Sequence, residues 1–150
     1  MIAGGIERDA KWLDTHNPHK DKADFEKAGD LTGKFVLSAQ SVSGLGNIYT
    51  DEVLHRAGVR HDRPAGALSR SELRRLADAI VETLREAIVA GGSTLGDAQY
   101  VDIAGAGGTF QDRHRVYGRE GLSCVTCDRG RIRRATVGGR STFYCPRCQK

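Results

Sequence analysis

The sequence has 150 residues, of which 39% are hydrophobic and 28% are charged, and it contains 19 glycines. This composition excludes collagen-like, low-complexity and fully disordered proteins, and it suffices for one modest core with a smaller module beside it. There is no apolar run of about 18 residues, and charge follows the first residues where a secretory signal would be apolar, so we expect a soluble cytoplasmic protein without a membrane segment.

Positive charge is concentrated toward the C-terminal end of the sequence. The net charge is +4, but residues 111–150 contain ten basic and three acidic residues, which gives +7 there and leaves −3 for the first 110 residues. Most of these basic residues are arginines, whose guanidinium groups match phosphate oxygens in a bidentate way. One interpretation is a polyanionic partner, and the other is a solvated face that only aids solubility.

The first 41 residues give weak structural signals. Residues 1–23 form a polar, irregular segment that is compatible with partial disorder. Residues 24–41 hold short apolar groups that are compatible with two short helices broken near Gly29.

A glycine-punctuated turn precedes a short helix predicted over residues 48–57. Asn47 is predicted to cap the N-terminus of this helix, and Gly58 is predicted to end it. Asp51 and Glu52 stand early in the helix, where its dipole favours acidic residues. Such a turn can direct backbone N–H groups and the Asn47 amide toward a phosphate, although a plain tight connection explains the same residues.

The strongest helix signal lies between Ser69 and Ala90. Ser69 and Glu72 have the spacing of a capping box, and a pair of glycines ends the run. Apolar residues follow at spacings of three and four: Leu73, Leu76, Ile80, Leu84 and Ile88. The glycine-rich residues 91–108 predict a loop, which is either a mobile functional loop or a plain linker.

Residues 131–137 and 140–144 are predicted to form a β-hairpin around a two-glycine turn. Strand alternation places one set of side chains on one face (Arg131, Arg133, Ala135, Val137) and a second set on the other (Ile132, Arg134, Thr136). Arg140 follows the turn directly, so we expect it at the exposed tip of the hairpin. An arginine there can clamp a phosphate, or it is merely solvated.

All four cysteines lie in two Cys-x-x-Cys pairs. Cys124 and Cys127 form the first pair, Cys145 and Cys148 form the second, and 17 residues separate the pairs. This spacing is typical of a four-cysteine zinc site, in which a hairpin brings two tight turns together. Two disulfides are the alternative, but nothing marks the sequence as secreted. Four thiolates leave no open position for a substrate water, so we expect one structural zinc ion that folds the last part of the chain.

Four stretches of the sequence occur in the order known from one protein family. They are Gly44-Leu45-Gly46-Asn47-Ile48-Tyr49 with Asp51-Glu52, Gly91-Gly92-Ser93-Thr94-Leu95, Val116-Tyr117-Gly118-Arg119-Glu120-Gly121, and residues 138–150. Together they resemble the C-terminal half of the formamidopyrimidine-DNA glycosylases of the Fpg/Nei family. The resemblance implies a mainly α fold, with a helix-two-turn-helix domain over residues 24–110 and a small zinc-finger β-hairpin over residues 111–150.

The same resemblance implies how DNA is held. In the family, the residues that match Asn47 and Arg140 grip phosphates flanking a damaged nucleotide that is rotated out of the duplex, and the glycine-rich loop lies over the extruded base. The resemblance also assigns Gly46, Tyr49 and Arg119 to this DNA-binding surface. We therefore expect zinc-dependent binding of double-stranded DNA that is damaged or abasic.

The sequence departs from the family pattern at the catalytic nucleophile. The family uses an N-terminal proline followed by a glutamate, in a β-rich domain that precedes the helical one, whereas this sequence begins Met1-Ile2-Ala3. No catalytic residue is therefore predicted, and Glu52, which matches a family glutamate, is expected to serve structure. We expect the DNA-binding portion of a base-excision glycosylase and abasic-site lyase. The alternatives are a split enzyme whose partner chain supplies the proline domain, and a zinc ribbon that binds RNA or protein.

Overall fold

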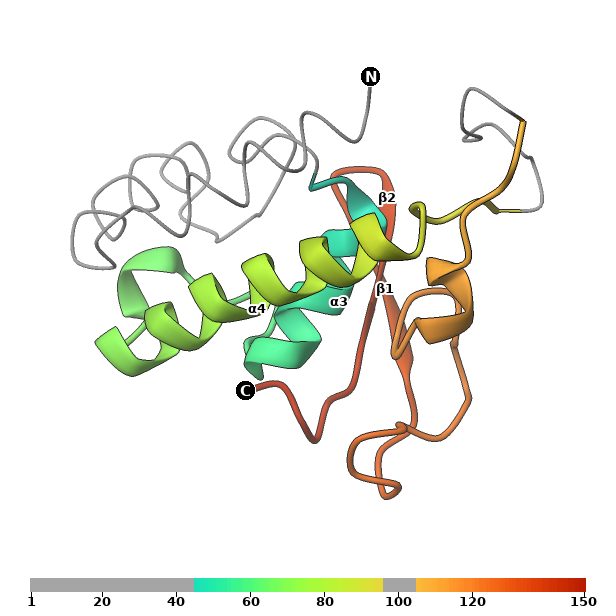
Figure 1. The fold of residues 1–150 in the computed structure, drawn as a ribbon. Helices are drawn as coiled ribbons and strands as arrows, with labels where there is room; N and C mark the ends of the chain where they lie inside the picture. Colours follow the sequence, from blue (N-terminus) through green and yellow to red (C-terminus); the bar gives the residue numbers. More distant parts are fainter. Residues whose placement is uncertain (1–44, 96–104) are drawn as a thin grey trace.

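The computed structural model describes residues 45–95 and 105–150, so the predictions for residues 1–44 fall outside the described part. Six elements follow one another along it: helix α3 (Asn47–Ala57), 3-10 turn η1 (Ala65–Ala67), helix α4 (Arg70–Val89), 3-10 turn η2 (Phe110–Arg113), strand β1 (Arg133–Val137) and strand β2 (Arg140–Tyr144). Helices α3 and α4 pack on each other, and β2 of the antiparallel hairpin contacts α3 (Figure 1). The expected mainly α architecture with a small hairpin is confirmed.

Helix α3 begins one residue earlier than predicted. Gly46 is its N-cap, with extended backbone and no side chain to cap the helix, so Asn47 is the first helical residue. The predicted capping role of Asn47 is wrong, because its amide nitrogen instead donates to the carbonyl oxygen of Ser141 at 2.9 Å. Gly58 ends the helix as predicted, with a φ of 71° that favours glycine.

Helix α4 follows the predicted pattern closely. The backbone N–H of Glu72 donates to Ser69 Oγ at 3.3 Å, and the Glu72 carboxylate accepts from the Ser69 N–H at 2.8 Å, which completes the capping box. Four of the five predicted core positions are buried, and Ile88 is half-buried against the same core. Across the helix pair, Arg56 donates to Glu86 at 2.7 Å and to Glu82 at 3.2 Å.

The main core lies between α3, α4 and their connection. It consists of twelve buried hydrophobic residues: Leu45, Val53, Leu54, Ala57, Val59, Leu68, Leu73, Leu76, Ala79, Ile80, Val81 and Leu84. Because the apolar residues of α4 recur every three or four positions, one stripe of this helix is buried while its opposite face stays exposed. This stripe holds α3 in a fixed position.

The hairpin turns at Gly138 and Gly139, whose φ values of 56° and 78° suit a two-residue turn. Arg140 pairs with Val137 directly after the turn and is exposed, as predicted for the tip. The first strand is shorter than predicted, because residues before Arg133 pair with a different segment. Ile132 exchanges backbone hydrogen bonds with residues 121–122, and its side chain is buried although that of Arg134 is exposed. These two residues, which were predicted to share one face of the hairpin, therefore differ in burial, because Ile132 lies before the start of β1.

A second, smaller core lies under the cysteines. It contains Val116, Cys124, Ile132 and Cys145, with Phe143 packed against it. The last residues of the chain then return to the end of α3. The amide of buried Gln149 accepts from the Cys145 N–H at 2.8 Å and donates to the carbonyl oxygen of Val59 at 3.0 Å. In the two described ranges, no helix has the length and apolar character needed to cross a membrane.

Candidate metal centre and nucleic-acid interface

The four cysteine sulfurs converge on one point. Their Sγ atoms all lie within 4.8 Å of one another, with 3.7 Å between Cys124 and Cys148 and 3.8 Å between Cys127 and Cys145. These separations exclude a disulfide bond, which requires about 2.05 Å. A tetrahedral zinc ion with bonds of about 2.3 Å to sulfur would place the sulfurs about 3.8 Å apart. The donor set therefore fits one zinc ion with no open coordination position.

Gly130 is a residue of the metal centre that the sequence interpretation missed. A Cβ atom at this position would lie 2.6 Å from Cys145 Sγ and 3.4 Å from Cys127 Sγ. Since the first of these separations is far inside van der Waals contact, the turn after Cys127 approaches the sulfurs closely only because residue 130 has no side chain. Its position three residues after Cys127 was the available signal.

The structure brings Asn47 and Arg140 to one edge of the molecule. The Asn47 side chain donates to the carbonyl oxygen of Ser141, which directly follows Arg140 at the start of β2. Gly46 is exposed at the same helix end, and a Cβ there would meet nothing within 4 Å. The N-terminal end of α3 therefore places backbone N–H groups, which carry partial positive charge, beside the exposed guanidinium of the hairpin tip.

Tyr49 and Arg119 have different surroundings. Tyr49 is half-buried, packs against the main core and lies 5.5 Å from the Phe110 ring between centroids. Arg119 is half-buried in the turn that leads to the first cysteine pair, and its Nε atom is buried without a hydrogen-bond partner in the described part of the chain. Tyr49 thus packs between the main core and Phe110, which follows the glycine-rich loop.

The acidic residues of α3 are buried rather than placed in its first turn, so the predicted role of the helix dipole is wrong for them. Both accept backbone hydrogen bonds from the C-terminal quarter of the chain. Asp51 accepts from the Phe143 N–H at 2.7 Å. Glu52 accepts three N–H groups of residues 115–117 at 2.9–3.0 Å. Burial is the main cause that raises the pKa of Asp51 to about 8, against the lowering effect of the Phe143 N–H.

Both ends of the glycine-rich loop are held together, although its middle lies outside the described residues. Ser93 and Thr109 form an isolated β-bridge, and buried Ser93 Oγ lies 3.1 Å from His114 Nε2. The Gln111 side chain accepts from the Thr94 N–H at 3.0 Å. A Cβ at Gly108 would collide with the backbone of Gly91 and Gly92, so only glycine fits there.

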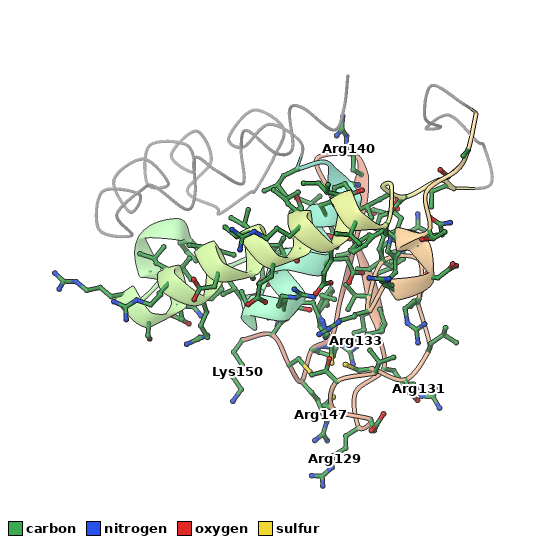
Figure 2. All side chains as sticks on the ribbon, in the orientation of Figure 1. Arg129, Arg131, Arg133, Arg140, Arg147 and Lys150 are labelled. Atoms are coloured by element: carbon green, nitrogen blue, oxygen red, sulfur yellow. The ribbon has the colours of Figure 1, made fainter. Side chains whose placement is uncertain are left out.

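The basic residues of the C-terminal quarter do not form a single patch. Figure 2 shows Arg140 at one end of the hairpin, next to the start of α3, and Arg129 and Arg147 at the opposite end, beyond the cysteines. Arg131 lies near that second end and donates to the carbonyl oxygen of Gly121 at 2.8 Å. Arg140 is therefore separated from the other labelled arginines.

Comparison with known proteins gives two family matches. The family described as the formamidopyrimidine-DNA glycosylase H2TH domain matches residues 13–99, and the family described as the zinc finger found in FPG and IleRS matches residues 121–150. The predicted cofactor is thereby confirmed, because the four cysteines that converge on one point lie in a zinc-finger sequence and can hold one zinc ion.

Curated relatives are similar over the C-terminal part of their own length. The formamidopyrimidine-DNA glycosylase of Thermus thermophilus is 49% identical over 114 residues, which cover 76% of this chain and 42% of that protein. The protein of the same name from Cereibacter sphaeroides is 52% identical over 117 residues, which cover 77% of this chain and 40% of that protein. The chain spans about two fifths of the length of these relatives.

Solved structures are similar in the same region. MutM (Fpg) from Thermus thermophilus superimposes with a TM-score of 0.75 and 43% identity, over 85% of this chain and 49% of that chain. The Lactococcus lactis Fpg in a complex with DNA that contains an abasic site gives a TM-score of 0.70 and 32% identity, over 86% of this chain and 47% of that chain. The fold and the zinc finger therefore agree between sequence and structure comparisons.

Proposed function

Because the chain belongs to the formamidopyrimidine-DNA glycosylase family, we propose that it grips the phosphate backbone of damaged duplex DNA in base-excision repair. One observation carries the proposal: the Asn47 amide at the start of α3 donates a hydrogen bond to the carbonyl oxygen of Ser141, the residue after Arg140. Two groups that we assign to phosphate binding, from distant parts of the sequence, therefore share one edge. Helix N-termini and arginines are the groups that proteins use most readily to bind phosphate.

The binding surface that we propose contains Gly46, Asn47 and Arg140 in direct contact with DNA, while Tyr49 fixes the helix from behind. The Lactococcus lactis Fpg complexes with Fapy-dG DNA and abasic DNA support damaged DNA as the ligand. Phosphate contacts position a protein on DNA without reading its sequence, so we expect little base preference from these residues. For Arg119 we propose a weaker, outlying contact.

Zinc, when bound, supplies a structural cross-link between the two cysteine pairs and no reactive ligand position. The chain's own residues do the rest. Asn47 and Asp51 hold β2 against α3 through hydrogen bonds with Ser141 and Phe143. These bonds fix the separation between the hairpin tip and the N-terminal end of the helix. The proposed DNA binding depends on zinc because Arg140 is held by a hairpin whose far end is tied at Cys145. A cytoplasmic location, where thiols stay reduced, belongs to the same proposal.

The glycosylase and abasic-site lyase chemistry of the family is also a proposal for this chain. Glu52 is fully engaged with the backbone of residues 115–117, which favours a structural role over a catalytic one. We propose that the proline domain of the family, in the same polypeptide or in a partner chain, supplies the nucleophile. Borohydride trapping on an abasic duplex tests this: a covalent adduct formed by the 150-residue chain alone would contradict the division of labour.

A salt titration of DNA binding tests the proposed grip. Fluorescence anisotropy of a duplex with one abasic site would be measured for the zinc-loaded chain and for Arg140→Ala, Asn47→Ala and Arg147→Ala. Arg140→Ala is expected to weaken binding to every sequence and to reduce the salt slope by about 1. Arg147→Ala, which removes the same charge at the opposite end of the zinc finger, is the matched control and should leave the slope unchanged.

Two outcomes would contradict the proposal. An equal effect of Arg140→Ala and Arg147→Ala would show a diffuse charge effect instead of a defined contact. Binding that survives Asn47→Ala unchanged would favour the zinc-ribbon alternative, in which RNA or a protein is held by another surface. A competition with single-stranded RNA and with duplex DNA of the same length would then identify the ligand.

A further inference from the structure

Three side chains on one face of α3 reach the C-terminal quarter of the chain. They are Asn47, Asp51 and His55, and their spacing of four residues aligns them along the helix. Asn47 contacts Ser141 at 2.9 Å and Asp51 contacts Phe143 at 2.7 Å. We refer to these three residues as the polar seam. Its third member, His55, lies against the metal centre and takes no part in the proposed DNA grip.

His55 lies beside a metal-binding sulfur. Its side chain is only 3% exposed, and its Nε2 atom lies 3.5 Å from Cys124 Sγ. The other ring nitrogen, Nδ1, is buried and has no hydrogen-bond partner in the described part of the chain. A buried polar group without a partner is costly, so a hydrogen bond between Nε2 and the Cys124 sulfur would offset part of the cost of burying this ring.

The chemistry of the sulfur decides which nitrogen carries the proton. A zinc-bound thiolate has lone pairs and no hydrogen, so it can only accept a hydrogen bond. If Nε2 were the unprotonated nitrogen, its lone pair would face the thiolate across 3.5 Å. The contact is therefore favourable only in the tautomer with the proton on Nε2, and Nδ1 is then the nitrogen left without a partner.

Two other cysteines accept hydrogen bonds from the backbone of their own turns. The sulfur of Cys127 accepts from the backbone of Arg129 and Gly130, and that of Cys145 accepts from the backbone of Arg147 and Cys148. These donors belong to the same tight turns as the cysteines themselves. The His55 ring reaches Cys124 from a helix 69 residues earlier in the sequence.

We propose that His55 is a positioning residue of the zinc site, whose Nε2–H donates to the Cys124 thiolate and thereby couples metal binding to helix α3. Residues in this outer position orient metal ligands, and their loss typically lowers metal affinity 10- to 100-fold. The coupling runs in both directions, because whatever strengthens zinc binding through His55 also stabilises α3 against the zinc finger. This inference does not depend on the ligand of the Arg140 edge.

Zinc competition against a chromogenic chelator tests the proposal in the full chain. His55→Leu fills the same buried space without a donor, and zinc affinity is expected to fall about 10- to 100-fold. His55→Gln places its amide nitrogen near the position of Nε2, and its affinity should stay within about 3-fold of wild type, since the donor is retained. His114→Leu is the matched control, because it removes a buried histidine that contacts Ser93 instead of a cysteine.

The absorption spectrum of the cobalt-substituted protein gives a second measurement. A hydrogen bond to a thiolate lowers the energy of the sulfur lone pairs, so the sulfur-to-cobalt charge-transfer band should move to longer wavelength in His55→Leu and keep its wild-type position in His55→Gln. Loss of packing alone would not separate the two variants in this way. Unchanged zinc affinity in His55→Leu, or equal losses of affinity and equal band positions in both variants, would overturn the proposal. If His55→Leu does not fold, the affinity and band position of His55→Gln decide alone, and a wild-type value for both is required.

Discussion

The helical unit (residues 45–95) and the zinc finger (residues 111–150) bury their interiors by different means. In the described residues, the helical unit has a core of twelve hydrophobic side chains, whereas the zinc finger has a core of four, two of which are cysteines. Small modules that bury little apolar surface need a metal or another cross-link to fold. The edge formed by Asn47 and Arg140 therefore lies between a unit that is stabilised by packing and a unit whose cysteines can be cross-linked by a metal.

Removal of zinc should produce the largest effect and should separate the two units. Structural zinc sites contribute on the order of 10 kcal/mol, so we expect the zinc finger to lose its structure in a strong chelator. Helix α4 should remain, since its buried stripe does not involve the cysteines. Hydrogen exchange measured by mass spectrometry before and after chelation checks this. Equal loss of protection in α4 would show that the two units unfold as one.

Leu76→Ala should destabilise the helical unit and leave the zinc finger intact. Leu76 is fully buried in the centre of the helical core, and truncation of such a side chain costs about 2–5 kcal/mol. We expect the urea midpoint of helix unfolding to fall by a corresponding amount while the zinc affinity stays the same. The control is Val89→Ala in the same helix, where the side chain is 82% exposed and the effect should be within about 0.5 kcal/mol.

Asp51→Asn tests how the contact between α3 and β2 makes the free energy of unfolding depend on pH. The carboxyl has a pKa of about 8 in the folded chain and about 4 when unfolded, so between these values the folded state holds a proton that the unfolded state has lost. The free energy of unfolding therefore falls as pH rises from about 4 to 8. Each pKa unit is worth about 1.4 kcal/mol, so half of the displacement already amounts to about 3 kcal/mol.

The asparagine variant keeps an oxygen that can accept from the Phe143 N–H but does not titrate. We expect its stability to vary less between pH 5 and pH 8 than that of the wild type, and to exceed it at pH 8. Urea unfolding of both proteins at several pH values measures the difference, in which the contribution of zinc cancels. Parallel pH profiles would show that Asp51 is ionised throughout.

Ser69→Ala should have the smallest effect and should remain confined to the helical unit. Loss of an N-cap oxygen costs about 1 kcal/mol. The hydrogen bonds with Ser69 hold the pKa of Glu72 at about 2, so part of this stability is also lost as pH falls from about 4 toward 2. Thermal unfolding at neutral pH checks the value, and Ser69→Thr, which keeps the oxygen, should restore it. A change in zinc affinity would contradict the confinement.

The sequence predicted those features that depend on neighbours in the chain. The capping box of α4 needs only Ser69 and Glu72, and the zinc site needs only the spacing of two cysteine pairs. The exposed position of Arg140 follows from a two-glycine turn. Each of these is decided within a short stretch, so the pattern of residue types was sufficient.

What the sequence did not predict depends on contacts between distant parts of the chain. Asn47 has the residue type of an N-cap, but its amide is used by Ser141, which lies 94 positions later. Asp51 and Glu52 have the residue types of a first helical turn, yet both are buried by the zinc finger. Nothing in the sequence near His55 indicates that its ring contacts a cysteine sulfur, because Cys124 lies 69 positions later. Only the packed structure shows that one helix face serves the hairpin and the metal centre together.

The separation in sequence also sets an order of events during synthesis. The contacts of Asn47, Asp51 and Val59 with the zinc finger join residues 90–94 positions apart. At about 5–20 residues per second, a ribosome needs about 5 to 20 seconds to make the second partner after the first. During that interval α3 and α4 can pack, while the face of α3 that carries two acids and a histidine is still open to water. The edge formed by Asn47 and Arg140 is thus completed only after α3 and α4 have had time to pack.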